Sequence, residues 1–158
     1  MPLEPTTERP WPTEREPRTP WGSGWPRWGR EPSSFFEGNL VEAERAFGEA
    51  ARELHNLGYR LGAAQARANL AEAKLQLEKT EEALALLEES EPVFRGLKAT
   101  MSLVETLRCR GVALLTLDRP KESLRAVEEA LALAEGNGLE AALPALETLR
   151  EKAAVVAG

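Results

Sequence analysis

Three twelve-residue segments align without a gap: Asn39-Leu-Val-Glu-Ala-Glu-Arg-Ala-Phe-Gly-Glu-Ala50, Lys79-Thr-Glu-Glu-Ala-Leu-Ala-Leu-Leu-Glu-Glu-Ser90 and Arg119-Pro-Lys-Glu-Ser-Leu-Arg-Ala-Val-Glu-Glu-Ala130. They recur every 40 residues, and a fixed period of this kind indicates a repeat architecture. In the second segment a large residue, Leu87, stands between the small residues Ala83 and Ser90. Positions i, i+4 and i+7 share one face of an α-helix. We therefore expect each segment to be a helix that a neighbouring helix approaches closely through its small residues.

An earlier amphipathic stretch precedes the second and third segments. Each stretch has one apolar helical stripe, formed by Leu61, Ala64, Ala68, Ala71 and Leu75 in one and by Met101, Val104, Leu107, Gly111 and Leu114 in the other. Thr80 suits the N-cap of the helix that follows it, and Gly58 and Gly136 suit helix ends. The pattern predicts a unit of helix, short turn and helix, with a longer link to the next unit.

These units predict an all-α fold. We expect the second helix of unit 1 at about 40–57, unit 2 at about 61–97, unit 3 at about 100–135 and a closing helix at about 139–156. A plain bundle of four or five helices also places small residues on helix faces. The gapless recurrence over three units favours a stack of helical hairpins over such a bundle.

The pattern resembles the tetratricopeptide repeat family. Leu70-Ala71 and Arg110-Gly111 stand at the family's small position late in the first helix, and its second-helix positions are filled by Ala83, Leu87 and Ser90 and by Ser123, Val127 and Ala130. Arg67 and Leu107 stand where the family has an early aromatic residue. The period of 40 exceeds the family's 34 and is similar to that of sensor segments in bacterial regulators. Over residues 35–158 the resemblance implies a right-handed α-α superhelix.

The resemblance also implies a function in binding. First helices of such repeats line a concave groove, which here is formed by Gln65, Ala68, Asn69, Glu72 and Gln76 and by Glu105, Arg108, Val112 and Thr116. Asn69 is expected to pair with a peptide backbone, and Arg108 with a carboxylate. The partner would be a protein or peptide, and the chain a scaffold, in one interpretation a piece of a signalling or transcription regulator. A solvated groove without a ligand is the alternative.

The first 34 residues differ in composition from the rest of the chain. They contain all four tryptophans and eight of the eleven prolines, and no Leu, Ile or Val occurs between Leu3 and Leu40. Proline at this density opposes regular structure, so we expect residues 1–34 to be an irregular or disordered tail. Stacking on single-stranded nucleic acid, binding to a proline-recognition domain and a mis-assigned start of the reading frame are three further interpretations of the segment.

The first unit lacks a first helix in this interpretation. Counting back 40 residues reaches a stretch with Pro26 and Pro32, and residues 35–39 then correspond to the last turn of the missing helix. The alternative function is therefore self-association through the uncovered N-terminal face, with Phe35, Phe36 and Phe47 as contact residues. This alternative makes the chain a homo-oligomer.

Composition argues against several other functions. The 158 residues suit one domain, and a net charge of −6 argues against nucleic acid and anionic membranes as partners. His55 and Cys109 are the only histidine and cysteine, so we expect no catalytic site, no metal site and no cofactor. Cys109 is expected to be a small buried apolar residue. No signal peptide or membrane span is apparent, which predicts a cytoplasmic protein.

Overall fold

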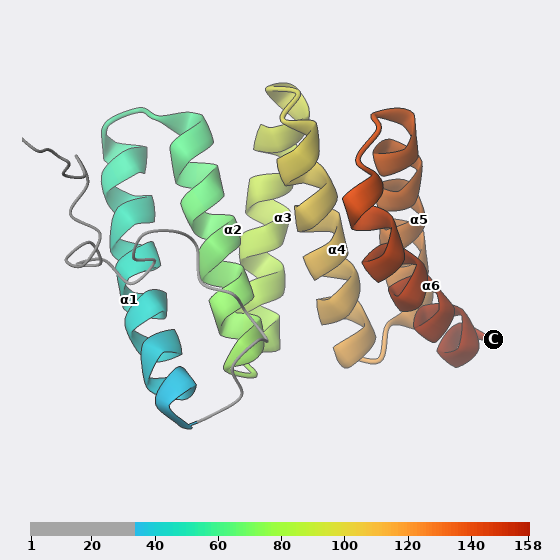
Figure 1. The fold of residues 1–158 in the computed structure, drawn as a ribbon. Coiled ribbons are helices and arrows are strands. Elements are labelled where there is room, and N and C mark those ends of the chain that lie inside the picture. The colour runs from blue at the N-terminus through green and yellow to red at the C-terminus, as the bar shows by residue number, and fades with distance from the viewer. Residues whose placement is uncertain (1–33) are drawn as a thin grey trace, which may run out of the picture.

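Within residues 34–158, which are the residues described by this computed structural model, six α-helices follow one another and no strand occurs (Figure 1). They are α1 (Ser34–Asn56), α2 (Arg60–Gln76), α3 (Thr80–Gly96), α4 (Thr100–Thr116), α5 (Pro120–Gly136) and α6 (Leu143–Ala157), with a short 3-10 turn, η2 (Glu140–Ala142), before the last. Side chains are described from Asn39 onward. The tail expected over residues 1–34 lies outside the described residues, except that Ser34 begins α1.

The links between the first five helices are all three residues long, which corrects the expected alternation of short and long links. Each link contains one residue with a left-handed backbone, and the residue after it donates its N–H to a carbonyl five positions earlier, as Tyr59 does to Leu54 at 2.9 Å. This hydrogen bond is typical of a Schellman motif, which ends a helix within a few residues. The same motif ends the helix within a hairpin and the helix between two hairpins, so all four links have the same length. The left-handed residues are Gly58, Glu78, Lys98, Asp118 and, after α5, Gly138.

The residues predicted to begin and end helices do so only in part. Gly58 ends α1 as predicted, with φ of 82°. Gly136 is still helical, and Gly138 two residues later takes the left-handed conformation. Thr80 is the first residue of α3, and the N-cap, Lys79, makes no side-chain capping bond.

The helices form an open row and not a closed bundle. Successive helices pack against each other, and α2 also contacts α4, as α4 contacts α6. Among the described residues, the backbone of α1 lies close to no helix other than α2, and the backbones of α3 and α5 are not close, although Arg95 of α3 pairs with Glu129 of α5 at 2.6 Å. The even-numbered helices therefore lie closer together than the odd-numbered ones, and we call the surface of α2, α4 and α6 the inner face (Figure 1).

Small residues form the crossing points between successive helices, as predicted. Ala83 and Ser123 are both 0% exposed, which confirms that they point into the stack. Ala83 packs in one cluster with Ala71 of α2. One repeat later, Ser123 donates a hydrogen bond from Oγ to the carbonyl of Gly111 at 2.7 Å. Because these pairs recur at the same spacing in both repeats, the two helices of each α-hairpin make their closest contact at equivalent positions.

The first helix differs from the prediction. Residues 35–39 were expected to be the end of a separate helix, but α1 runs without a break from Ser34 through Gly38 and Asn39. Glycine inside a helix costs about 1 kcal/mol relative to alanine, which is too little to end a helix that its neighbours favour.

The last helix, α6, carries polar residues at the positions equivalent to those through which α4 packs against α5. Glu147 and Glu151 stand one repeat after Leu107 and Gly111, and both glutamates are exposed. Pro144 lies in the first turn of α6, where the missing N–H costs no hydrogen bond. In the described part of the chain, no helix combines the length and the apolar character needed to cross a membrane.

Candidate binding cleft

A cleft of about 70 Å³ opens between α2 and α4 on the inner face. Each helix contributes four residues, spaced so that they share one helical face, and α3 contributes a single apolar residue. The lining residues are Gln65, Ala68, Asn69 and Glu72 of α2, Ser102, Glu105, Thr106 and Cys109 of α4, and Leu87 of α3.

The structure brings together five of the nine predicted groove residues. Gln65, Ala68, Asn69, Glu72 and Glu105 line the cleft from two successive units. The other four, Gln76, Arg108, Val112 and Thr116, do not line it. Val112 packs against the main apolar core, and the Thr116 hydroxyl donates to the carbonyl of Val112 at 2.9 Å.

Two polar side chains of the cleft lack hydrogen bonds within the protein. Nδ2 of Asn69 and Oγ1 of Thr106 are both buried and have no hydrogen-bond partner among the described residues. Thr106 as a whole is only 1% exposed. A buried polar group without a partner typically costs about 1–3 kcal/mol. These two groups therefore destabilise the folded protein at this cleft.

The repeat does not require polar residues at these positions. Asn69 aligns with Cys109 in the next unit, and Thr106 aligns with Ala66 in the unit before it and with Leu146 in the unit after it. Thr106 was not among the predicted groove residues. Its departure from the apolar residues at the same register is the sequence signal by which it could have been found.

A polar bridge joins the two helices at one part of the cleft. The Ser102 hydroxyl donates to Oε1 of Gln65 at 3.0 Å and so ties α4 to α2 directly. Ser102 was also missed by the sequence prediction. The bond fixes the separation of the two helices where the cleft opens.

Arg108 forms an ion pair within its own helix. Its Nη2 donates to Oε1 of Glu105 at 2.9 Å and its Nε donates to the same carboxylate at 3.1 Å. The side chain is 27% exposed. Residues three apart on a helix are neighbours, so this pair forms within α4, and any ligand carboxylate would compete with Glu105 for Nε and Nη2 of Arg108.

Burial governs the titration of the cleft. Burial raises the pKa of Glu72 above its usual range, Arg108 opposes the rise and Glu105 adds to it. Burial also raises the pKa of the Cys109 thiol to about 12, so the thiol is neutral at pH 7 and a poor nucleophile. Cys109 is buried, which confirms the prediction of a small apolar residue.

Phe47 does not lie on an open N-terminal face. It is 1% exposed and packs in a cluster with Ala43 of its own helix and Leu70 of α2. The reason is that the apolar stripe of α1 faces α2, so the large residue fills the interface within the hairpin. The prediction of Phe47 as a self-association residue is therefore wrong. The side chains of Phe35 and Phe36 lie outside the described residues.

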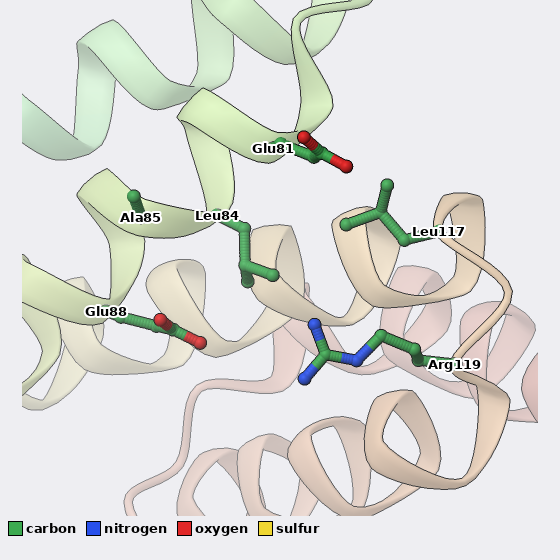
Figure 2. A pocket seen from close by; sticks show the side chains of 6 residues that line it. All are labelled: Glu81, Leu84, Ala85, Glu88, Leu117 and Arg119. Carbon is green, nitrogen blue, oxygen red and sulfur yellow. The ribbon is translucent and has the colours of Figure 1, made fainter.

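A second and larger hollow, of about 370 Å³, lies between α3 and the link that joins α4 to α5 (Figure 2). It is formed by Glu81, Leu84, Ala85 and Glu88 of α3 with Leu117 and Arg119 from the link between α4 and α5. Its charged side chains are exposed, and Arg119 already pairs with Glu122 at 2.5 Å. Water satisfies such groups, so the smaller cleft with its buried polar atoms is the stronger candidate for a specific site.

Comparisons with known proteins add no relative. No family model, curated protein or solved structure matches this chain significantly. Within the part of the chain that the structure describes, no group of three or more His, Cys, Asp or Glu side chains is placed to hold a metal ion.

Proposed function

We propose that this chain is a non-catalytic helical-repeat scaffold of the tetratricopeptide type, a right-handed α-α superhelix that binds a protein or peptide on its inner face. The 40-residue register and the open row of hairpins support this proposal. In such a row the first helix of each unit lines one continuous surface, which suits an extended ligand.

One observation carries the proposal. Gln65, Asn69 and Glu72 of one unit and Glu105 of the next converge on a single cleft at the contact between α2 and α4. Their side chains offer both donors and acceptors of hydrogen bonds, which is what the backbone and polar side chains of a bound peptide require. A surface that served only to cover the core would not need buried polar groups at this contact.

The test is a selection of random peptides displayed on phage against the full chain, followed by NMR mapping of a selected peptide. We expect the shifts in amide resonances to concentrate on the cleft residues of α2 and α4. Shifts concentrated on α3 and α5, or a selection that yields no binder above background, would contradict the proposal.

Two charge reversals provide a matched comparison. Glu105 and Glu88 are both exposed glutamates on helices, but only Glu105 lines the cleft, whereas Glu88 lines the separate hollow beside the link between α4 and α5. Glu105→Lys is expected to weaken binding of the selected peptide about tenfold, which corresponds to the loss of one good polar contact, and Glu88→Lys to leave it unchanged. Equal losses in both variants would indicate a general charge effect and not a site on the inner face.

A further inference from the structure

We propose that the cleft between α2 and α4 binds a primary carboxamide, namely the side chain of an Asn or Gln residue in the bound peptide. This inference rests on the proposed function and specifies the residue that the scaffold recognises. It follows from the two unpartnered polar groups, the charges beside them and the size of the space.

The unpartnered groups require a hydrogen-bond acceptor. Nδ2 of Asn69 can only donate, and the hydroxyl of Thr106 can donate as well as accept. Both groups are buried at the cleft and make no hydrogen bond within the protein. A ligand oxygen that accepts from both would remove an unfavourable feature of the free protein, and this gain would appear as affinity.

The charges beside these groups disfavour a carboxylate and suit a neutral ligand with N–H groups. Glu72 and Glu105 line the same cleft, and a ligand anion would be placed among them. Arg108, the nearest compensating cation, is already paired with Glu105. An ammonium group would suit the glutamates, but it has no acceptor to offer Asn69. A carboxamide satisfies both requirements, because its oxygen accepts and its NH₂ group donates.

The dimensions agree with this choice. A cavity of about 10–15 Å³ already holds one water molecule, so the cleft of about 70 Å³ has room for a small group of several heavy atoms. A carboxamide has three heavy atoms. The apolar lining by Leu87, Ala68 and the neutral thiol of Cys109 would contact the methylene groups of an Asn or Gln side chain.

The test uses small probes and the unmodified full chain. N-acetylglutamine N-methylamide is titrated while the side-chain NH₂ resonances of Asn69 and the methyl resonance of Thr106 are followed by NMR. Saturable shifts in the millimolar range are expected, as for a ligand of this size. The corresponding blocked alanine has the same two backbone amides without the carboxamide, and blocked glutamate replaces the carboxamide by a carboxylate. Both are expected to bind at least about tenfold more weakly.

A pair of threonine variants tests the contact itself. Thr106→Val preserves the shape and removes the hydroxyl, and it is expected to weaken binding of blocked glutamine about tenfold. Thr116→Val is the control, since Thr116 lies on the same helix, is exposed and bonds only to its own turn. Thermal unfolding of both variants verifies that they fold, and the probe series on the unmodified chain does not depend on either variant.

Three results would overturn the inference: equal binding of blocked glutamate or blocked alanine, unchanged binding in Thr106→Val, or no shift of the Asn69 and Thr106 resonances at any attainable concentration. Failure of the proposed function is distinguishable from these. A selected peptide that maps to the inner face and binds Thr106→Val as tightly as the unmodified chain would leave the scaffold function standing and remove the carboxamide site.

Discussion

Alanine at Gly111 is expected to destabilise the protein, although alanine favours helices more than glycine does. A Cβ atom at Gly111 would lie 2.6 Å from Cγ2 of Val127 and 3.2 Å from Cδ2 of Leu149. Carbon atoms prefer about 3.5–4.0 Å, so α4 and α5 would have to separate by roughly 1 Å at this point. Val127 cannot turn away, because a β-branched side chain in a helix has essentially one rotamer.

The magnitude follows from three contributions. Overpacking of a tight core typically costs about 1–3 kcal/mol. Separation of the helices also weakens the buried hydrogen bond from Ser123 to the carbonyl of Gly111, at a cost of about 0.5–1.5 kcal/mol. The higher helix propensity of alanine returns about 1 kcal/mol. We expect Gly111→Ala to lower the free energy of unfolding by roughly 1–3 kcal/mol, the overpacking being the dominant contribution.

Urea denaturation followed by far-ultraviolet circular dichroism measures this change, with Gly48→Ala as the control. Gly48 lies within α1, and its nearest neighbour to an added Cβ is Cδ2 of Leu70 at 3.9 Å, an ordinary contact. Gly48→Ala should therefore raise stability by about 0.5–1 kcal/mol. If Gly111→Ala were as stabilising as Gly48→Ala, the close approach of α4 and α5 would be refuted. Adding Val127→Ala to Gly111→Ala makes room for the methyl group, so the double variant should be more stable than the sum of the single effects predicts.

Four further substitutions test other parts of the structure. Lys74 bonds Glu44 of α1 at 2.8 Å and Glu82 of α3 at 2.7 Å, so Lys74→Met should lower the free energy of unfolding by about 1–2 kcal/mol in urea melts. The hydrogen bond from Lys74 is the main cause that lowers the pKa of Glu44, so stability should fall as the pH drops below the usual value of 4.5, and less steeply in the variant. Glu78→Gly should raise the free energy of unfolding by about 0.5–1 kcal/mol because Glu78 has φ of 65°. Gly58→Ala, at φ of 82°, should lower it by a similar amount. Changes of the same sign in both variants would contradict the left-handed backbone of the links. Glu72→Gln should be more stable than the parent protein at neutral pH. Burial raises the pKa of Glu72, so the native parent holds this proton more tightly than the unfolded chain does, and the stability of the parent falls as the pH rises above 4.5. Urea melts at a series of pH values would show the difference in stability between the two proteins widening with pH.

The repeat and its contact points were predictable because they depend on residue size at a fixed spacing. Ala83 and Ser123 are small at equivalent positions, and both are fully buried where helices cross. The equal links were not predictable in the same way. Three of the left-handed residues are Glu78, Lys98 and Asp118, and only glycine gives a clear sequence signal for that conformation. A tertiary arrangement that packs the flanking helices imposes the conformation on these residues.

The cleft was predictable only in part. The stripe of Gln65, Asn69 and Glu72 follows from helical spacing along one helix. Thr106 was missed because its role depends on which face of α4 meets α2, and spacing within one helix does not determine that. The pairing of Arg108 with Glu105, its neighbour on the same helix, was also not foreseen, although residues three apart can form such a pair.

Both the cleft and its proposed ligand depend on direct contact between α2 and α4, two helices that are not consecutive in the chain. The hydrogen bond from the Ser102 hydroxyl to Oε1 of Gln65, at 3.0 Å, links them directly. The most direct measurement is therefore the nuclear Overhauser effect between the side-chain protons of these two residues in the full chain. We expect a cross-peak between the Ser102 β protons and the Gln65 side-chain amide. Cross-peaks from Ser102 to its own helix and to α3 alone, with none to any residue of α2, would contradict the contact and the cleft with it.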